Sequence, residues 1–312
     1  EETGRVASTG GRHPEATKPT ATKPKRKRKP NTDMLAREAQ VAGVSRSTMA
    51  QAAALMDKAP ELAAKVKSGE TTLKAATAKI KRAKRNQKVA EQARADPNRA
   101  EIRDQDALFF LKSFPAKSAD LILTDPPYMT DVEDIAAFAA KWVPVALSRL
   151  KPNGRAYICT GAYPEELHAY LSVLLKAKNF VTSNVLVWTY RNTLGPTPKA
   201  DYKNNWQAVF HVRGEKAEPL DCPTMLEQFS VQDINAPDGR QGDRFHAWQK
   251  PDELGRRLVC HSTKAGDLVL DPFAGTGTFI LAAAALGRRA IGCDSNLGMV
   301  KIAEERGALR AT

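Results

Sequence analysis

Cysteine is scarce in this 312-residue sequence, and its four cysteines stand far apart. Cys159, Cys222, Cys260 and Cys293 form no C-x-x-C pair and have no histidine at the spacing of a zinc site. We therefore expect neither a disulfide framework nor a bound metal. This pattern favours a reducing compartment and predicts a cytoplasmic, intracellular protein.

Long apolar runs are also missing from the sequence. No stretch approaches the roughly 20 apolar residues that a transmembrane helix requires, and the first residues do not form a secretory signal. We therefore expect no membrane partner. Because the first residue is Glu1 rather than methionine, one interpretation is that the chain is an N-terminally truncated fragment.

Negative charge is sparse in the first 100 residues, which hold 23 Lys and Arg against 10 Asp and Glu. The other 212 residues hold 25 of each sign, so the first third carries the whole net charge of +13. A basic block beside a neutral domain predicts a polyanionic partner, and nucleic acid is the commonest one.

Residues 1–32 contain almost nothing apolar and are predicted to be a disordered basic tail. The tail includes an unbroken basic run made of Lys25, Arg26, Lys27, Arg28 and Lys29. We expect this run to contact DNA phosphates, because charge blocks often serve as nucleic-acid-binding arms. A solvated linker that only raises solubility is the alternative.

Residues 33–85 have a helix-forming composition, rich in Ala, Leu, Lys and Met. A helix over Met34–Ala42, a turn at Gly43 and a second helix Arg46–Asp57 capped by Ser45 predict a helix-turn-helix module. In such a module the recognition helix opens with the candidate DNA-binding residues Arg46, Ser47, Thr48 and Gln51.

The segment 59–76 resembles the part of ParB-type partition proteins that follows their helix-turn-helix. This resemblance supports a DNA-binding module over 33–85. A small helical bundle or a protein-protein module is the alternative. Residues 86–100 are predicted to be a basic linker.

From residue 101 the pattern alternates between strands and helices, which predicts a doubly wound, largely parallel α/β sheet over 101–312. The expected strands are 101–103, 121–124, 155–160, 184–190, 206–212, 268–270 and 290–292. The expected helices are 107–114, 135–150, 165–178 and 279–286, and 151–154 is expected to be a turn. The strands 184–190 and 206–212 are expected to form an antiparallel pair at one edge of the sheet.

Two stretches of this domain, 191–205 and 214–245, lack clear periodicity and are predicted to be long loops. Loops of this length inside a compact domain are usually functional or disordered. One or both are therefore candidates for reading the DNA sequence.

The strand 121–124 ends abruptly in the residues Asp125-Pro126-Pro127-Tyr128. The prolines cannot continue a central strand, because neither nitrogen carries a proton and both φ angles are fixed. Backbone carbonyls are therefore turned outward beside a carboxylate and an aromatic ring. This set is suited to holding a planar heterocycle that carries an amino group. Taken alone, the stretch also fits a strand-ending turn with a capping aspartate.

A second motif follows the strand 268–270, where the loop Asp271–Thr278 contains Gly275 and Gly277 and leads into a helix. A further strand then ends at Asp294. Strand, glycine loop, helix, strand and acid form the nucleotide-binding half of a doubly wound fold, and the acid typically binds ribose hydroxyls. We expect the strands 121–124 and 268–270 to be neighbours at the switch point of the sheet, although they are far apart in the chain.

Together the two motifs resemble those of the S-adenosylmethionine-dependent amino-methyltransferases of DNA, in the order of the β class, where D-P-P-Y precedes the glycine loop. The resemblance covers about residues 101–307 and implies a Rossmann-like methyltransferase sheet with circularly permuted motif order. Other matching stretches are 102–108, 118–128, 150–154, 186–188, 246–251 and 289–292. The sequence departs from the family at Gln105, where glycine is usual, at Ala247, where proline is usual, and at Asp294, where glutamate is usual.

The resemblance implies that the amine of a flipped base attacks the sulfonium methyl of S-adenosylmethionine. The implied catalytic residues are Asp125, Pro126, Pro127 and Tyr128, with Asp125 and the Pro126 carbonyl accepting the amine N–H groups and Tyr128 stacking on the base. The implied cofactor-binding residues are Asp106, Gln249, Lys250, Pro251, Asp271, Pro272, Phe273, Ala274, Gly275, Thr276, Gly277, Thr278 and Asp294. Asp106 is expected to face the adenine ring and Asp294 the ribose, while Gln249, Lys250 and Pro251 lie near the methionine end.

Within the family, D-P-P-Y rather than S-P-P-Y favours N6 of adenine over N4 of cytosine. Duplex DNA is the expected partner, and the transfer needs no metal. Three alternatives stay open: cytosine-N4 methylation, methylation of RNA or of a protein glutamine, and a partition-like or regulatory DNA-binding protein with an inactive methyltransferase domain. A homodimer, the recognition sequence and a partner restriction enzyme are equally left open.

Overall fold

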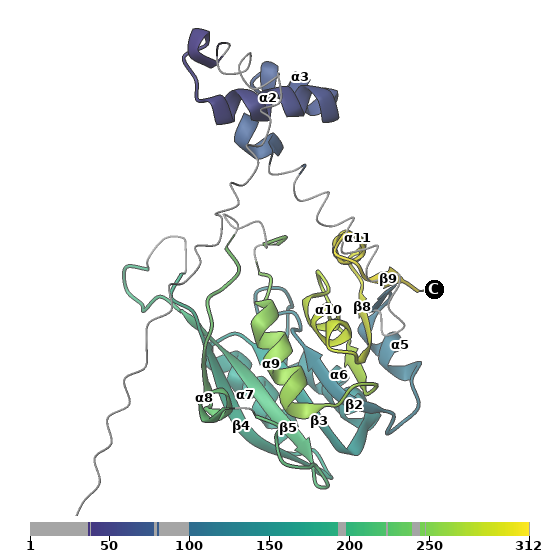
Figure 1. Cartoon of the computed structure of the whole chain (residues 1–312). Coiled ribbons are helices and arrows are strands. Elements are labelled where there is room, and N and C mark those ends of the chain that lie inside the picture. The colour runs from purple at the N-terminus through teal and green to yellow at the C-terminus, as the bar shows by residue number, and fades with distance from the viewer. Residues whose placement is uncertain are drawn as a thin grey trace, which may run out of the picture. The chain divides into compact units, whose positions relative to one another are not determined.

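A computed structural model describes residues 37, 39–77, 80, 100–192, 198–222, 224–238, 244–246 and 248–311 of the chain. The chain divides into two compact units, Glu1–Ala76 and Thr77–Thr312 (Figure 1). The predicted tail 1–32, with its basic run Lys25–Lys29, lies outside the described residues, and so do residues 86–99 of the predicted linker.

In the N-terminal unit, helix α2 (Arg46–Lys58) begins at the residue predicted from the sequence. The Ser45 hydroxyl accepts a hydrogen bond of 3.1 Å from the Thr48 amide and caps the helix. Gly43 forms the preceding turn with a φ of +64°, and helix α3 (Pro60–Lys67) follows. Leu55 of α2 is buried. The capped second helix is confirmed, while its role in DNA binding stays a prediction.

The second unit is built on one sheet of nine described strands. The strands are β1 (Glu101–Asp104), β2 (Ala119–Thr124), β3 (Leu150–Thr160), β4 (Phe180–Thr189), β5 (Trp206–Gly214), β6 (Val231–Asp233), β7 (Leu268–Asp271), β8 (Arg289–Asp294) and β9 (Leu309–Arg310). Their spatial order is β6-β4-β5-β3-β2-β7-β8-β1-β9. Only β5 runs antiparallel to its neighbours among the described pairings. The predicted doubly wound, largely parallel sheet is confirmed.

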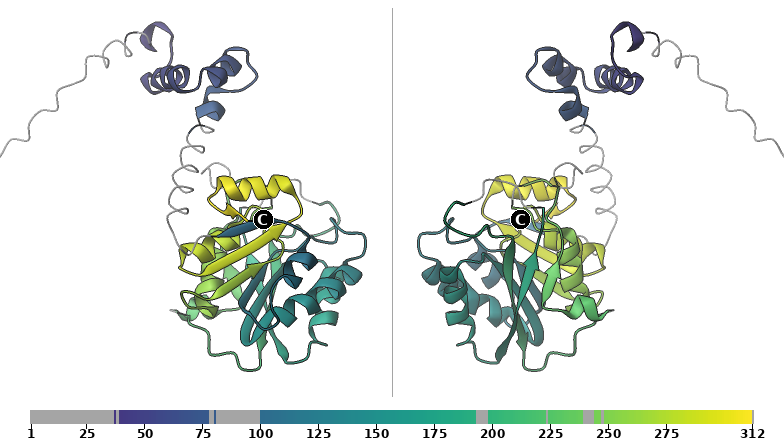
Figure 2. Two further views of the ribbon diagram at one scale, coloured as in Figure 1. Left: turned by 90° about the vertical axis from the view of Figure 1, so that its right-hand side faces the viewer. Right: turned by 90° about the vertical axis from the view of Figure 1, so that its left-hand side faces the viewer.

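Two layers of helices cover the sheet, one on each face (Figure 2). Helices α5 (Ala107–Lys112), α6 (Ile135–Arg149) and α7 (Pro164–Leu174) pack in one apolar core with side chains such as Ile122 and Ile158. Helices α9 (Asp252–Ser262), α10 (Thr278–Ala285) and α11 (Leu297–Glu305) pack in the other core with Leu121, Leu123 and Val269. Since both faces are covered, the central strands are apolar in consecutive positions, as β2 shows.

Strands β2 and β7 are parallel neighbours, with Leu121 beside Val269 and Ile122 beside Leu270. This confirms the predicted adjacency of the two motif-bearing strands. The carboxyl end of a parallel strand is where loops can meet a ligand, so both motifs open onto the same edge of the sheet.

Three predictions about the sheet were wrong in detail. The stretch 214–245 is not entirely irregular, because it contains the short helix α8 (Met225–Gln228) and strand β6. The antiparallel pair β4–β5 exists, but β6 pairs with β4 on the outside, so the pair does not form the edge. Strand β3 already begins at Leu150, ahead of the residues where a turn was expected. A three-residue strand is too short to produce a recognisable hydrophobic period, which explains why β6 was missed.

Among the described residues, no helix is long and apolar enough to cross a bilayer.

Candidate active site

The ends of β2 and β7 are joined by a buried hydrogen bond. The Thr124 hydroxyl donates to Oδ1 of Asp271 over 2.6 Å, and both residues are at most 1% exposed. The same Asp271 oxygen accepts from the Phe273 amide at 3.1 Å. These contacts lock the first turn of the glycine loop against the residue that precedes Asp125. The two motifs are therefore parts of one site.

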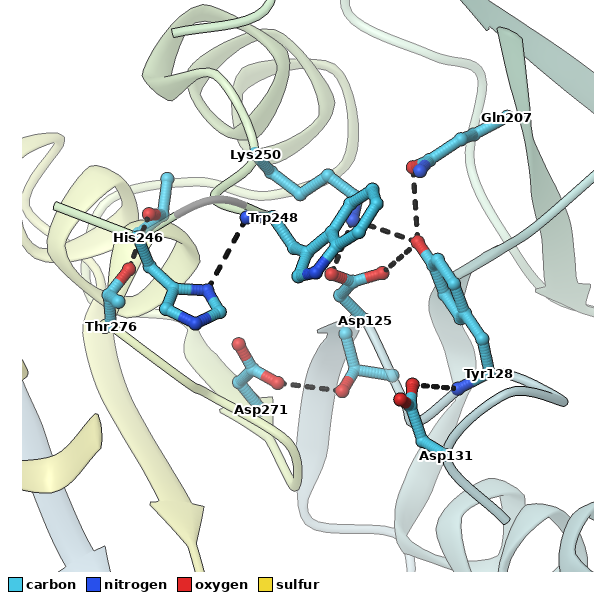
Figure 3. Close-up of polar contacts among 11 residues, drawn as sticks. Asp125, Tyr128, Asp131, Gln207, His246, Trp248, Lys250, Asp271 and Thr276 are labelled. Carbon is cyan, nitrogen blue, oxygen red and sulfur yellow. Dashed lines mark hydrogen bonds and ion pairs between the residues drawn. The ribbon is translucent and has the colours of Figure 1, made fainter. Parts of the chain in front are cut away.

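At the mouth of this site, Asp125 is held by two side chains of the chain itself (Figure 3). Its Oδ1 accepts a hydrogen bond of 2.8 Å from the Tyr128 hydroxyl, and its Oδ2 forms an ion pair with the Lys250 ammonium. The Lys250 ammonium also donates to the Tyr128 oxygen at 2.9 Å. Lys250 is buried, with 4% of its side chain exposed, whereas 22% of the Asp125 side chain reaches solvent. The carboxylate is thus the accessible part of a buried pair.

The Tyr128 hydroxyl has a further partner in Gln207 of β5, whose Oε1 lies 3.1 Å away. Burial raises the pKa of Tyr128 well above its ordinary value, and the neighbouring Asp125 carboxylate adds to the shift. Tyr128 therefore remains a neutral hydroxyl at physiological pH, and its ring is fixed by hydrogen bonds at its far end.

Glu166 supports the same loop from helix α7. Its Oε1 accepts a hydrogen bond of 2.6 Å from the amide of Met129, the residue after Tyr128. Its Oε2 lies 2.0 Å from the position that a Cβ on Gly161 would take, so a larger residue at 161 would displace this carboxyl group. Burial raises the pKa of Glu166. This carboxyl group is therefore part of the framework that fixes the turn after Asp125.

The glycine loop is shaped by two residues in the left-handed region. Gly275 has a φ of +51° and Gly277 a φ of +79°, conformations that L side chains rarely adopt. Gly277 caps the N-terminus of α10, and a Cβ there would lie 3.0 Å from the Cβ of Ala303. Nothing lies within 4 Å of the position of a Cβ on Gly275, so the loop backbone can approach a ligand closely at that point.

Asp294, at the end of β8, is bonded to this loop. Its Oδ2 accepts from the Gly275 amide at 2.9 Å, and its Oδ1 accepts from the Asn296 amide at 2.8 Å. Burial raises the pKa of this carboxyl, although the two amides oppose the shift. The half-buried carboxyl therefore both holds the glycine loop and lines the edge where a ribose is expected.

The carboxyl group of Asp271 has a strongly raised pKa. Burial raises the pKa of its carboxyl to about 8, and the hydrogen bonds from Thr124 and Phe273 only partly offset this. Its side chain points to β2 rather than to solvent, since the residue is 1% exposed. We infer that Asp271 contributes to the loop by holding its backbone.

The remaining predicted cofactor residues lie in separate parts of the chain, and the first of them, Asp106, follows β1. Asp106 is exposed and caps α5, where its Oδ1 accepts from Leu108 at 2.9 Å and from Phe109 at 3.1 Å. It ends the segment that follows β1, and the neighbouring Gln105 amide donates to the Asp294 carbonyl at 3.2 Å. Asp106 therefore lies on the same sheet edge as Asp294. Gln105 has no positive φ, so its turn does not need the glycine usual in the family.

The segment around Lys250 is folded by Gln249, whose Oε1 accepts from the Phe245 amide at 2.8 Å. Pro251 then starts α9 from a buried position. Lys250 was expected near the methionine end of the cofactor, which stays a prediction, and its ammonium contacts Asp125 and Tyr128. The sequence resemblance had no means of indicating this pairing.

Thr276 and Thr278 of the loop are tied to the C-terminal side of α11 by Arg306. Its Nη1 donates to the Thr276 carbonyl at 2.7 Å and to the Thr278 hydroxyl at 2.8 Å. The guanidinium also lies 4.8 Å from the centroid of the Phe245 ring. Arg306 thereby connects the glycine loop with the segment that leads to Lys250. No motif in the sequence singled out this arginine.

The aromatic and histidine residues near the site have structural partners. Trp188 is 3% exposed and donates to the Ile234 carbonyl at 2.7 Å, and Tyr190 packs on it with ring centroids 4.8 Å apart. His261 is buried beside Glu227 at 3.1 Å. In Figure 3, His246 lies on the side of the glycine loop, and the exposed Trp248 lies on the side of Lys250.

The described candidate DNA-binding residues belong to the N-terminal unit. Arg46, Ser47 and Gln51 are exposed and Thr48 is half-buried on the first turns of α2, in the N-terminal unit. The Gln51 amide donates to the Ser47 hydroxyl at 3.4 Å. The candidates Lys25–Lys29 lie outside the described residues.

The carboxyl edge of the sheet has the features of a site for an organic cofactor with ribose hydroxyls. The carboxyl edge offers an open glycine backbone, a helix N-terminus and Asp294. In the part of the chain that the structure describes, no group of three or more His, Cys, Asp or Glu is placed to hold a metal ion.

Comparison with known proteins identifies the fold and the family. The DNA methyltransferase PvuII, described as cytosine-N4-specific, aligns with a TM-score of 0.58 and 20% identity over 66% of this chain and 86% of that chain, which shows a shared fold. TTHA0409 of Thermus thermophilus, a protein assigned as a DNA modification methylase, aligns with a TM-score of 0.51 and 29% identity over 67% of this chain and 94% of that chain. Another structure of TTHA0409 is a complex with S-adenosyl-L-methionine.

Sequence comparison leads to the same group of proteins. The type II methyltransferase M2.DpnII of Streptococcus pneumoniae is 28% identical over 239 residues, which cover 64% of this chain and 87% of the relative. M.HpaI of Haemophilus parainfluenzae is 27% identical over 226 residues, covering 64% and 71%. Residues 119–305, which include both motifs, match the family model N6_N4_Mtase, described as DNA methylase. The chain therefore belongs to the N6_N4_Mtase family of DNA methylases.

Proposed function

We propose that this chain is a site-specific methyltransferase that moves a methyl group from S-adenosylmethionine to the exocyclic N6 amine of a flipped adenine in duplex DNA. The observation that carries the proposal is the bond between Thr124 and Asp271, which places the Asp125 carboxylate next to the glycine loop. An acceptor for an amine and a cradle for the methyl donor thereby share one edge of the sheet.

When bound, S-adenosylmethionine supplies an electrophilic methyl group on a cationic sulfur. The chain must make the amine nucleophilic, because the amine lone pair is delocalised into the base ring. Asp125 and the Pro126 carbonyl are the acceptors that can take its N–H groups and direct the lone pair away from the ring. The glycine loop and Asp294 would hold this donor, which would supply the methyl group that replaces one amine proton, and that proton would pass to solvent. Orientation and electrostatics supply the acceleration.

The cofactor residues proposed from the geometry are Gly275, Gly277 and Asp294, with Asp106 on the same edge. The open backbone at Gly275 allows close approach, and Asp294 can turn one of its oxygens towards ribose hydroxyls. Ring stacking by Tyr128 on the target base is part of the same proposal, although its hydroxyl is already held by Asp125 and Gln207.

The N-terminal unit is proposed to hold the DNA. Arg46, Ser47 and Gln51 are exposed on the capped helix α2, as side chains that reach a groove must be. The first 100 residues supply the net positive charge that the methyltransferase unit lacks, and charge of this sign attracts phosphates.

Adenine is preferred over cytosine because the motif at 125–128 is D-P-P-Y. The structural similarity to the cytosine-N4-specific PvuII enzyme keeps cytosine as the competing target, since that similarity covers 66% of this chain.

The test is modification-sensitive sequencing of DNA from cells that express the chain, compared with cells that express Asp125→Ala. We expect N6-methyladenine at one short sequence in the first sample and its loss in the second. N4-methylcytosine at a defined sequence would reassign the base. If the purified chain transfers no tritiated methyl group to any DNA, and does so to RNA or to protein, the proposed substrate is wrong.

A further inference from the structure

The contacts of Asp125 raise a question that the proposed function does not answer. Both oxygens of this carboxylate are already engaged, Oδ1 by the Tyr128 hydroxyl at 2.8 Å and Oδ2 by the Lys250 ammonium. A target amine that donates to Asp125 therefore has to share an oxygen with one of these groups or take its place.

Of the two partners of Asp125, the Lys250 ammonium can leave the carboxylate with fewer lost contacts than the Tyr128 hydroxyl. The Tyr128 hydroxyl belongs to the same tight turn as Asp125, and the amide of Met129 that follows it is held by Glu166 at 2.6 Å. Lys250 comes from a distant segment on a flexible four-carbon stem. If its ammonium leaves Oδ2, it keeps the Tyr128 oxygen as an acceptor at 2.9 Å and the face of the Trp188 ring at 5.9 Å.

Electrostatics also favour its departure before the methyl transfer. The methyl donor is a cation, and the amine gains positive charge as the N–C bond forms. The Lys250 ammonium, if it stays on the same carboxylate oxygen, repels the positive charge that develops on the amine. A neutral amine that takes its place is instead stabilised by the Asp125 carboxylate as its charge develops. An ammonium and an exocyclic amine are similar in size and both donate N–H groups, so one can replace the other without rearranging the loop.

We propose that Lys250 is a positioning residue that occupies Asp125 until the target amine displaces it. This inference rests on the proposed function. It predicts that a base without the amine cannot displace Lys250. It also predicts that the amine contributes little to the affinity of the wild-type chain for DNA, because its hydrogen bond to Asp125 replaces an ion pair of comparable strength.

The test measures how much the amine contributes to binding, with and without the lysine. The full chain is titrated by fluorescence anisotropy, in the presence of the unreactive cofactor analogue sinefungin, with two duplexes that carry the recognition sequence. One has the natural target base and the other its amine-free analogue, which is purine for adenine or 2-pyrimidinone for cytosine. We expect the two dissociation constants to agree within about twofold for the wild type and to differ by about tenfold for Lys250→Met.

Two variants serve as controls. Lys250→Arg keeps a cation that can pair with Asp125, so its ratio should stay near that of the wild type. Lys264→Met makes the same substitution at a side chain that is 87% exposed, and it should change nothing. If thermal melting shows that Lys250→Met does not fold, Lys250→Gln replaces it. Gln is also neutral, and its amide is a weaker hydrogen-bond donor than the lysine ammonium.

An equal ratio in the wild type and in the neutral variants overturns the inference. If Lys250 instead holds the cofactor, the ratio of the two DNA dissociation constants stays unchanged in the variants and the dissociation constant for sinefungin rises more than tenfold. This result too overturns the inference. The proposed function is tested separately, because it fails only if the wild-type chain leaves the natural duplex unmethylated.

Discussion

Replacing Thr124 by valine removes the hydroxyl that joins the two halves of the site and keeps the shape of the side chain. The hydroxyl donates to Asp271 over 2.6 Å in a fully buried place, so no water can substitute for it. We expect the free energy of unfolding to fall, and the loss to depend on pH because Asp271 titrates.

The sign follows from the direction of the Asp271 shift. Burial raises the pKa of this carboxyl to about 8, so its contribution to stability is complete below pH 4, where the unfolded chain is also protonated. That contribution is lost as the pH rises from about 4 through about 8. The hydrogen bond from Thr124 lowers the pKa and thus limits the loss. Without it, the loss begins at the same pH and continues to a higher one.

The size of the effect can be estimated from the two protonation states. A buried hydrogen bond between neutral groups contributes about 1 kcal/mol, and one to a charged group about 1.5–3 kcal/mol. Thr124→Val should therefore cost about 1 kcal/mol at pH 6 and about 2–3 kcal/mol at pH 9. The difference corresponds to an additional rise of roughly one unit in the pKa of Asp271, at about 1.4 kcal/mol per unit.

Urea unfolding followed by tryptophan fluorescence at pH 6 and pH 9 measures both values. Asp271→Asn keeps the acceptor oxygen and removes the charge, so in this background Thr124→Val should cost about 1 kcal/mol at either pH. Thr130→Val, at an exposed position, is the matched control and should have little effect. A cost that is the same at pH 6 and pH 9 in the otherwise wild-type chain would refute the argument.

Three further predictions concern the loops and their supports. Gly277→Ala should destabilise the chain by about 2 kcal/mol in urea unfolding, because it combines a positive φ with a contact at Ala303. Gly266→Ala has the same sign of φ and open space, so it should cost about 1 kcal/mol, and equal costs would contradict the role of the contact. Glu166→Ala should lower the free energy of unfolding by about 2 kcal/mol and reduce methyl transfer, because the Met129 amide loses its acceptor. Glu166→Gln keeps an acceptor oxygen and should lose less than half as much stability. Equal losses in the two variants would exclude the acceptor as the cause. Asp294→Ala should lower the melting temperature, because the Gly275 and Asn296 amides lose their acceptor, and should raise the dissociation constant of sinefungin about tenfold in calorimetry at a temperature where the variant is folded; an unaltered constant would remove this residue from the cofactor site.

The local parts of the fold could be predicted from the sequence. Strands β2 and β7 contain the short apolar runs 121–123 and 268–270 and are followed by a proline within two residues, and such runs indicate buried parallel strands. The Ser45 cap of α2 depends only on neighbours within one turn. The adjacency of β2 and β7 was predictable because their two motifs need each other chemically.

The side-chain contacts between distant segments could not be predicted. Lys250 lies 125 positions from Asp125, and the resemblance indicated only a place near the methionine end of the cofactor for it. Glu166 and Arg306 reach the site from helix α7 and from the end of α11, where no periodicity shows which way a single charged side chain points. Such contacts are decided by how the layers pack, and a single sequence carries no local signal for that packing.

The strand order has a consequence for how the protein is made. Strand β1 is synthesised first among the described strands, yet both of its neighbours, β8 and β9, come from beyond residue 288. Strand β2 likewise lacks one neighbour until β7 has been synthesised. On the ribosome the nascent chain therefore carries Asp125 and Tyr128 long before it has a glycine loop to face them. The two halves of the site can meet only after the glycine loop has been synthesised, and a chain interrupted before β8 contains every residue of the first motif but not the strand that carries Asp294.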